Sequence, residues 1–345
     1  MRMSKSTTKS RSVRRPKIHV HIENVSTYTD HTQVRPKHLA DAARRYPEVA
    51  RHIDTTVSWD FKDFDQHMQS AEVLIFMGID FDPANFAARA PKLKCIQLTC
   101  AGVDHFMPFD WLPEHVVVAN NGGVHADKEG EFALTAILML NHSVPFMVTN
   151  QRNAEWKQRF GSAVKGKTLA VIGVGEIGGA AAAKARRLGM RVIGVRRSGK
   201  PHPAVEKMYT PRDLRRVLGQ ADFVLVTLPL TAETRKMIDG QALGWMRPGA
   251  GLVNIGRGAT VDYVALAEAL KSRHLSGAVL DAYEEEPLPS SSFLWNTPNL
   301  IMSPHCSSSD VEQYIPMTLD LAYENLRRYI AGRPLINRID KRLGY

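Results

Sequence analysis

Three polar residues in the second half of the chain have the types and positions that proton-coupled chemistry requires. Arg257 follows the apolar run GLVNIG, Glu286 follows GAVLDAY and a short acidic turn, and His305 follows NLIMSP. A guanidinium can hold a carboxylate by two hydrogen bonds. An imidazole can give a proton to an oxygen and take it back, and a neighbouring carboxylate raises the imidazole pKa. Together the three groups could reduce a 2-keto acid, if a hydride donor is bound beside them.

Each of these residues also has a purely structural interpretation. Arg257 could be a charge on a surface loop, and His305 could cap a strand. Glu286 is one of three successive acids, so a solvated acidic turn is a fair alternative, and Glu285 competes with it for the same role. The three together are much harder to explain by accident than any one of them.

A glycine pattern upstream predicts the binding site for the hydride donor. Gly173, Gly175 and Gly178 form G-x-G-x-x-G directly after an apolar strand and at the start of an alanine-rich helix. In this context the first glycine permits a tight turn, the second admits a pyrophosphate, and the third lets helix and strand pack closely. The backbone N–H groups at Glu176 and Ile177 would face the anion. The alternative is a glycine turn that binds no ligand.

The next strand ends in two arginines. Arg196, Arg197 and Ser198 stand where an acid often follows to accept from a ribose 2′-hydroxyl. A carboxylate would repel a 2′-phosphate, whereas a guanidinium pairs with it. The sequence therefore predicts NADP(H) as the preferred cofactor. The alternative is that the arginines are solvated and that NAD(H) is used.

Alternating strand and helix patterns must position these residues. Such alternation predicts parallel sheets with helices on both faces, and the carboxyl ends of the strands then meet at one edge. A long helical stretch over 126–148 has an apolar face and acids in its first turns, and a last helix is expected at about 310–331. The expected strands lie at 17–22, 71–78, 93–102, 115–121, 167–173, 191–197, 222–230, 251–257, 277–283 and 299–305.

The composition limits the class of protein and the partners that we expect. The 345 residues carry a net charge of +10, but seven positive charges precede the first acid, Glu23, and without them the charge is +3. We expect residues 1–16 to be a disordered basic tail, with a targeting segment or a nucleic-acid arm as alternatives. No apolar stretch reaches the ~20 residues of a membrane span. The three cysteines contain no CxxC pair, so we expect a cytoplasmic protein without disulfides or a metal site.

Several motifs in order resemble one known family over about residues 70–310. The chain is similar to the D-isomer-specific 2-hydroxyacid dehydrogenases, which include glyoxylate/hydroxypyruvate reductases and phosphoglycerate dehydrogenase. The matching stretches are CAGVDHF (100–106), GKTLAVIGVGEIG (166–178), LPLTAETRKMI (228–238), MRPGAGLVNIGRGATVD (246–262), LDAYEEEPLP (280–289) and LWNTPNLIMSPH (294–305).

The resemblance implies roles for individual residues. Arg257 would hold the substrate carboxylate and keto oxygen, and His305 would be the general acid/base. Glu286, which directly precedes Pro287, would be its paired acid, in preference to Glu285. The remaining implied positions bind the cofactor or the substrate carboxylate: Asp281 and Ile255 at the nicotinamide carboxamide, Leu228, Pro229 and Thr234 on the adenosine side, and the turn Ala101, Gly102 and Val103 at the carboxylate.

The family also implies an architecture: two Rossmann-like, doubly wound α/β domains, of which the substrate domain is discontinuous and flavodoxin-like. We expect the substrate domain at 17–122 plus 311–345, the NADP-binding domain at 123–310, and a homodimer formed through the helical arm around 125–150. The expected function is reduction of a glyoxylate- or hydroxypyruvate-type 2-keto acid to a D-2-hydroxy acid. The alternative is a non-catalytic dinucleotide sensor of the same fold. We expect no nucleic-acid or membrane partner.

Some positions depart from the family pattern. HCSSSD replaces the usual small-residue, glycine-bearing turn after His305, so Cys306 lies either near the nicotinamide or as an inert packing thiol. DAY stands where DVF is common, which we interpret as a conservative change. Formate dehydrogenases share the fold but pair a glutamine with the histidine, and Glu286 argues against that activity.

Overall fold

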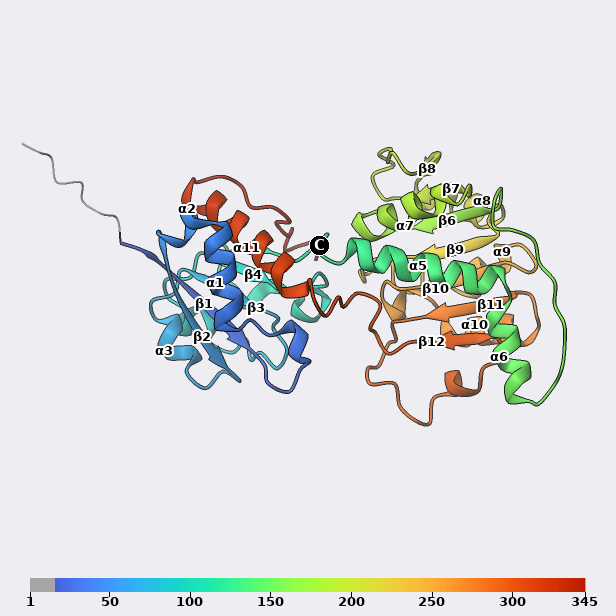
Figure 1. The fold of residues 1–345 in the computed structure, drawn as a ribbon, viewed down its shortest axis with the longest axis horizontal. Coiled ribbons are helices and arrows are strands. Elements are labelled where there is room, and N and C mark those ends of the chain that lie inside the picture. Colours follow the sequence, from blue (N-terminus) through green and yellow to red (C-terminus); the bar gives the residue numbers. More distant parts are fainter. Residues whose placement is uncertain (1–15, 345) are drawn as a thin grey trace, which may run out of the picture. The chain divides into compact units, whose positions relative to one another are not determined.

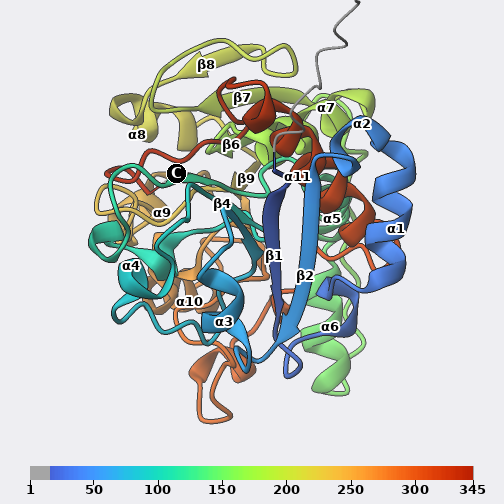
Figure 2. The ribbon, with the colours of Figure 1, turned by 90° about the vertical axis from the view of Figure 1, so that its left-hand side faces the viewer.

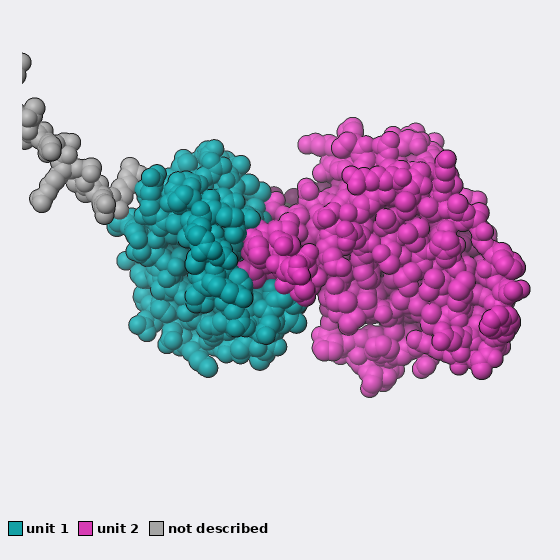
Figure 3. Space-filling view, in the orientation of Figure 1, with its two compact units in different colours: residues 1–99, 111–119, 319–336 teal, residues 100–110, 120–318, 337–345 magenta. Residues whose placement is uncertain are grey.

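A computed structural model describes residues 16–344, which divide into two compact units (Figure 3). Unit 1 comprises the described residues up to Thr99 together with Trp111–Ala119 and Leu319–Ile336. Unit 2 comprises Cys100–Asp110, Asn120–Thr318 and the residues from Asn337 onward. The expected basic tail, residues 1–16, falls almost wholly outside the described residues. The domain boundaries inferred from the sequence stay a prediction.

Unit 1 is built on a five-stranded parallel sheet in the order β2-β1-β3-β4-β5. In Figure 2, α1 and α2 lie on one side of β1 and β2, and α3 and α4 lie on the other. The elements are β1 Ile18–Asn24, β2 Ile53–Trp59, β3 Val73–Phe76, β4 Cys95–Leu98, β5 Val117–Ala119, α1 Pro36–Arg45, α2 Pro47–Ala50, α3 Phe64–Met68 and α4 Phe86–Arg89. The final helix, α11 Tyr314–Ile330, belongs to unit 1 from Leu319 onward.

Unit 2 contains a seven-stranded parallel sheet in the order β12-β11-β10-β9-β6-β7-β8 (Figure 1). Its strands are β6 Thr168–Ile172, β7 Arg191–Val195, β8 Lys207–Tyr209, β9 Phe223–Val226, β10 Gly251–Asn254, β11 Gly277–Leu280 and β12 Leu300–Met302. Its helices are α5 Ala126–Asn141, α6 Val144–Arg152, α7 Glu176–Arg187, α8 Leu214–Leu218, α9 Gly240–Trp245 and α10 Tyr263–Lys271.

Both faces of the unit 2 sheet are covered by apolar layers. Successive residues of a strand point to opposite faces, so neighbouring residues lie in different layers. Ile172 lies in one apolar layer together with Leu266 of α10. Its neighbour Val171 lies in the other layer, together with Ile137 of α5 and Ala182 of α7. Burial on both faces explains why these strands are nearly continuous apolar runs in the sequence. The two sheets confirm the predicted doubly wound α/β class.

The stretch 126–148 was expected to be one helix, and that expectation is wrong in detail. The chain forms α5 and α6, which meet at an angle of 65°. Ser143 between them has a φ of 58°, and Pro145, which has no N–H to donate, stands at the start of α6. Among residues 16–344 no individual helix has the length and apolarity of a membrane span, and this bent pair satisfies the two criteria only when taken together.

The order of strands gathers the residues of interest at one edge of the unit 2 sheet. Strands β10, β11 and β12 are neighbours, and they end just before Ile255, Asp281 and Ser303. Strand β6 ends before Gly173, beside β9. This is where the strand order reverses, which is the usual ligand position in a doubly wound sheet.

Candidate active site

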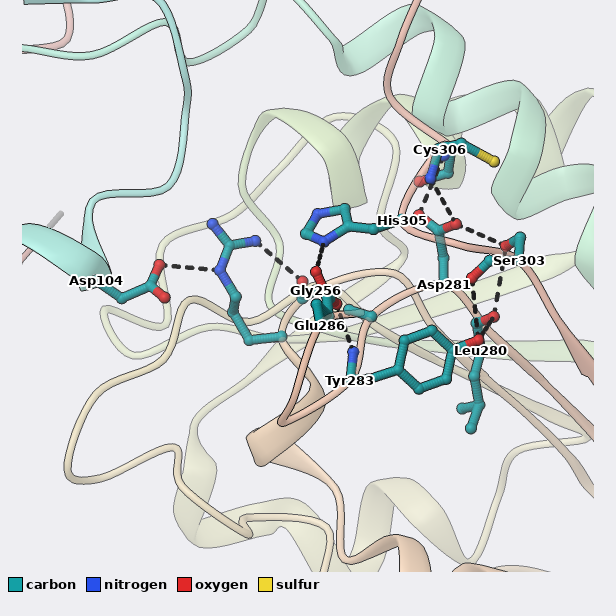
Figure 4. A network of polar contacts seen from close by, with 12 residues as sticks. Asp104, Gly256, Leu280, Asp281, Tyr283, Glu286, Ser303, His305 and Cys306 are labelled. Atoms are coloured by element: carbon teal, nitrogen blue, oxygen red, sulfur yellow. Dashed lines mark hydrogen bonds and ion pairs between the residues drawn. The ribbon is translucent and has the colours of Figure 1, made fainter. Parts of the chain in front are cut away.

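His305 and Glu286 form a hydrogen-bonded pair in unit 2. Glu286 Oε2 lies 2.6 Å from His305 Nδ1, and Figure 4 shows the two side chains pointing toward each other. The hydrogen bond that His305 donates to Glu286 raises the pKa of His305 against the opposing effect of burial. Burial works to raise the pKa of Glu286, but the bonds from His305 and the Tyr283 N–H outweigh it and hold that pKa below its usual value. The pair therefore favours an imidazolium with Nε2 left to face a reactant.

The backbone around both residues is fixed by Tyr283 and Asp281. The Tyr283 N–H donates to Glu286 Oε1 over 2.7 Å, and the Tyr283 hydroxyl donates to the Ser303 carbonyl over 3.0 Å. DAY differs from the commoner DVF at two positions, and the change from Phe to Tyr adds this hydroxyl. Sequence reasoning treated the change as conservative and so missed a bond that joins the two turns.

Asp281 is only 1% exposed and holds the turn that presents His305. Its carboxylate accepts from the Ser303 hydroxyl at 2.6 Å, the Cys306 N–H at 3.0 Å and the Ser307 N–H at 3.1 Å. His305 has a φ of 49°, a left-handed backbone conformation that a residue with a side chain adopts only when its surroundings impose it. These three bonds supply that constraint. The expected contact of Asp281 with a carboxamide stays a prediction.

Arg257 follows β10 and is oriented by a carboxylate that the sequence did not single out. Its Nε donates to Asp104 Oδ1 at 2.9 Å, and its Nη1 donates to the Gly256 carbonyl at 3.1 Å. Burial opposes ionisation of Asp104, but the adjacent guanidinium of Arg257 holds the Asp104 pKa below its ordinary value. The Arg257 carbonyl in turn accepts from Asn254 and Thr260. The remaining nitrogen, Nη2, makes no hydrogen bond among residues 16–344, so it can receive a ligand carboxylate.

The turn Ala101–Val103 lies against this guanidinium. A Cβ on Gly102 would stand 1.4 Å from Arg257 Nη2, so only glycine leaves the arginine in place. The Ala101 carbonyl is held by the Asn120 side chain at 2.7 Å, and Val103 is buried. The structure thus brings the expected carboxylate-binding turn and Arg257 together.

The glycine-rich turn has the geometry of a phosphate cradle. Gly173 has a φ of 105°, and a Cβ on Gly178 would stand 2.5 Å from the Gly173 carbonyl oxygen. No atom lies within 4 Å of the corresponding point on Gly175, so the approach to the backbone is open there. Glu176 and Ile177 are the first residues of α7, whose leading N–H groups have no partner within the helix. These residues fit a dinucleotide pyrophosphate.

The other expected cofactor residues lie around the same edge. Arg196 follows β7, and within the described chain its partly buried side chain makes no hydrogen bond or ion pair, whereas Arg197 and Ser198 are exposed. Thr234 uses its hydroxyl to close its own loop on the Pro229 carbonyl at 2.7 Å. Two more of the expected cofactor residues follow strand ends. Leu228 follows β9 and is partly buried, and Ile255 follows β10 and is 6% exposed.

A second acid that sequence reasoning missed is Glu129 on α5. It is 6% exposed, and burial raises its pKa to about 8. Arg257 and His305 act to lower that pKa and Asp281 to raise it, so Glu129 lies within reach of the charges of this site. In the sequence it is one of several acids near a helix start, and nothing in the spacing marks it as buried.

Comparisons with known proteins identify the family of this chain. Residues 134–307 match the family model described as D-isomer specific 2-hydroxyacid dehydrogenase, NAD binding domain. A glyoxylate reductase of Thermococcus litoralis is 31% identical over 285 residues, covering 80% of this chain and 86% of the relative. A glyoxylate/hydroxypyruvate reductase B of Pectobacterium carotovorum is 32% identical over 304 residues, covering 86% and 93%.

A solved structure extends the agreement to the whole fold. A D-isomer specific 2-hydroxyacid dehydrogenase from Xanthobacter autotrophicus Py2, in complex with NADPH and MES, matches with a TM-score of 0.80 and 28% identity. The match covers 96% of this chain and all of that one. The chain therefore belongs to the D-isomer specific 2-hydroxyacid dehydrogenase family, as an oxidoreductase with a site for a nicotinamide dinucleotide.

Proposed function

We propose that this protein reduces a small 2-keto acid, of the glyoxylate or hydroxypyruvate type, to a D-2-hydroxy acid with NADPH. The observation that carries the proposal is the 2.6 Å pair of His305 and Glu286 at the same sheet edge as Arg257. A proton donor and a carboxylate anchor at the mouth of a dinucleotide cradle are what such a reduction needs.

Arg257 and the turn Ala101–Val103 bind the substrate carboxylate. Nη2 of Arg257 lies over Gly102, and the backbone N–H groups of Gly102 and Val103 supply further donors to the same anion. Asp104 holds the guanidinium by its Nε and so fixes the plane in which the anion is received. The keto oxygen then lies between Arg257 and His305.

His305 supplies the proton. When bound, the reduced nicotinamide supplies a hydride to the keto carbon. The His305 imidazolium donates its Nε2 proton to the oxygen as negative charge develops there, and Glu286 stabilises the imidazolium before this transfer. Asp281 acts indirectly, because its three bonds keep the turn of His305 in place.

The preference for NADPH rests on Arg196 and Arg197. The Arg196 guanidinium, which makes no hydrogen bond or ion pair among residues 16–344, directly follows β7, at the strand end where a 2′-phosphate would lie. The residues that directly follow this strand, 196–200, include no carboxylate to repel that phosphate. The Xanthobacter relative is described in complex with NADPH, which supports the same choice. NAD(H) would bind without this charge-assisted contact.

The assembly we propose is a homodimer through the helical arm. Trp156 and Phe160, which follow α6, are 94% and 88% exposed. Large aromatic side chains so exposed are typical of contact surfaces. Light scattering of the purified protein should give twice the chain mass, and a monomer at micromolar concentration would contradict the proposal.

The test of the reaction is loss of the reduced-nicotinamide absorbance with a panel of 2-keto acids. The wild-type protein should turn over glyoxylate or hydroxypyruvate with NADPH. The His305→Gln variant should bind NADPH normally and lose turnover by at least about a hundredfold, the usual share of a general acid. NADPH binding without turnover on any keto acid would instead favour a non-catalytic dinucleotide sensor.

A further inference from the structure

Tyr263, the first residue of α10, carries a buried hydroxyl that the reaction described above does not use. The residue is 9% exposed, and its ring belongs to one of the two apolar layers of unit 2. Its hydroxyl donates to the Ala282 carbonyl at 2.5 Å and accepts from Asn254 Nδ2 at 2.9 Å. The directions of these bonds are fixed, because a carbonyl oxygen can only accept. Burial raises the pKa of Tyr263, so the hydroxyl keeps the proton that it donates.

The Ala282 carbonyl belongs to the same peptide group as the Tyr283 N–H. This peptide is trans, so its C=O and N–H point in opposite directions, one toward Tyr263 and the other toward Glu286. The Tyr283 N–H donates to Glu286 Oε1 at 2.7 Å, a bond drawn in Figure 4, and Glu286 Oε2 accepts from His305 Nδ1 at 2.6 Å. The donors from Tyr263 through this peptide therefore all point toward the paired acid.

Asn254, the last residue of β10, holds the start of this path. Its side chain is completely buried, and its Oδ1 accepts from the Gly256 N–H at 3.1 Å, which assigns Nδ2 to the side that faces Tyr263. The same Nδ2 also donates to the Arg257 carbonyl at 3.1 Å. One amide group thus joins the turn of Arg257 to the peptide that supports Glu286.

The direction of the Tyr283 N–H depends on the hydrogen bonds of its peptide group. A Cβ on Gly258 would lie 2.2 Å from the Tyr283 carbonyl carbon, so the two backbones are in close contact. Such packing is not directional, whereas a hydrogen bond is. Among residues 16–344, Tyr263 is the only donor to the Ala282 carbonyl, which is therefore the end of the peptide that Tyr263 holds.

We propose that Tyr263 is a positioning residue of the acid/base pair, whose hydroxyl orients the 282–283 peptide so that its N–H holds Glu286 against His305. This inference rests on the proposed function. Hydrogen bonds in series polarise one another, so a donor on the carbonyl also strengthens the bond that the N–H gives. Phenylalanine at position 263 would fill nearly the same volume and leave the buried Ala282 carbonyl without its donor.

The experiment measures the single-turnover rate of NADPH oxidation by glyoxylate or hydroxypyruvate, whichever the wild-type protein reduces faster. The KM for the keto acid and the Kd for NADPH are measured beside it. The variants are Tyr263→Phe and a protein with para-aminophenylalanine at position 263, which keeps an N–H donor for the Ala282 carbonyl. The matched control is Tyr323→Phe, because Tyr323 is a buried tyrosine of α11 in unit 1.

Tyr263→Phe should lower the single-turnover rate about three- to tenfold, the effect of one net hydrogen bond. The KM and the Kd should stay unchanged, since the Arg257 carbonyl keeps its bond from Asn254. The para-amino protein and Tyr323→Phe should keep the wild-type rate. In a Glu286→Ala protein the carboxylate through which Tyr263 acts is absent, so adding Tyr263→Phe should cause no further loss.

A folded Tyr263→Phe protein with the wild-type rate overturns the inference while the proposed function stands. A loss of the same size with and without Glu286 also overturns it, because the hydroxyl would then act on the structure generally. Should Tyr263→Phe fail to fold, the para-amino protein decides, and a tenfold slower rate in that folded protein overturns the inference. A wild-type protein that reduces no 2-keto acid overturns the proposed function and the inference together.

Discussion

Replacing Glu129 with glutamine should change how the stability of the nucleotide-free protein depends on pH. Burial raises the pKa of this carboxyl from 4.5 to about 8 in the native protein. Between those values the native state keeps a proton that the unfolded state releases, so the free energy of unfolding falls as the pH rises. The Glu129→Gln variant has no proton to release at this position and is spared that fall.

The size of the effect follows from the two pKa values. One pKa unit corresponds to about 1.4 kcal/mol. Between about pH 5 and about pH 8, the wild-type protein should lose roughly 3 to 4 kcal/mol of unfolding free energy relative to the variant. Most of that loss should fall between about pH 5 and about pH 7.5, where the unfolded carboxyl is ionised and the native one is not.

The assay is urea unfolding followed by tryptophan fluorescence at several pH values on both proteins. Taking the difference between them removes the contribution of every other titrating group that is unaffected by the substitution. Glu131→Gln serves as the control, because it makes the same substitution on the same helix at an exposed position. Stability curves for the wild-type protein and Glu129→Gln that run parallel across this range would refute the reasoning.

Three further outcomes are expected from the site. Arg196→Asp should lower the ratio of kcat/KM for NADPH over NADH by about 10- to 100-fold, since repulsion replaces a charge-assisted bond; an unchanged ratio contradicts the phosphate assignment. Glu286→Gln removes the carboxylate charge that helps to raise the pKa of His305, so the pH above which keto-acid reduction declines should fall by about one unit; a fixed pH profile argues against the pair. Gly102→Ala should displace the Arg257 guanidinium and raise the KM for the keto acid about tenfold with an unchanged melting temperature; an unchanged KM would show that the turn does not position the anion.

The edge of the unit 2 sheet was predictable because its strands are buried on both faces. Such strands are short apolar runs, and the polar residue or glycine that ends each run marks the carboxyl end. This reasoning located Gly173, Arg257 and His305 correctly relative to their strands. It failed for β2, which lies at the edge of the unit 1 sheet beside β1 and whose sequence IDTTVSW contains too many polar residues to resemble a buried run.

The supporting contacts were not predictable, because they join loops that are distant in sequence. Asp104 and Arg257 are 153 residues apart, and no local pattern ties one to the other. Asp281 was identified, but its three bonds to the 303–307 turn depend on how two strand ends meet. Glu129 resembled an ordinary acid that complements a helix N-terminus, and only packing decides that it is buried while Glu131 is exposed.

The central claim is that His305, Glu286 and Arg257 direct a hydride from the nicotinamide to the C2 carbon of a keto acid. The most direct measurement uses NADPH deuterated at the transferable 4-position with hydroxypyruvate, followed by mass and chiral analysis of the product. The account predicts one deuterium at C2 of a product with D configuration, formed by the wild-type protein and not by His305→Gln. A product of L configuration, or one without deuterium at C2, would contradict it.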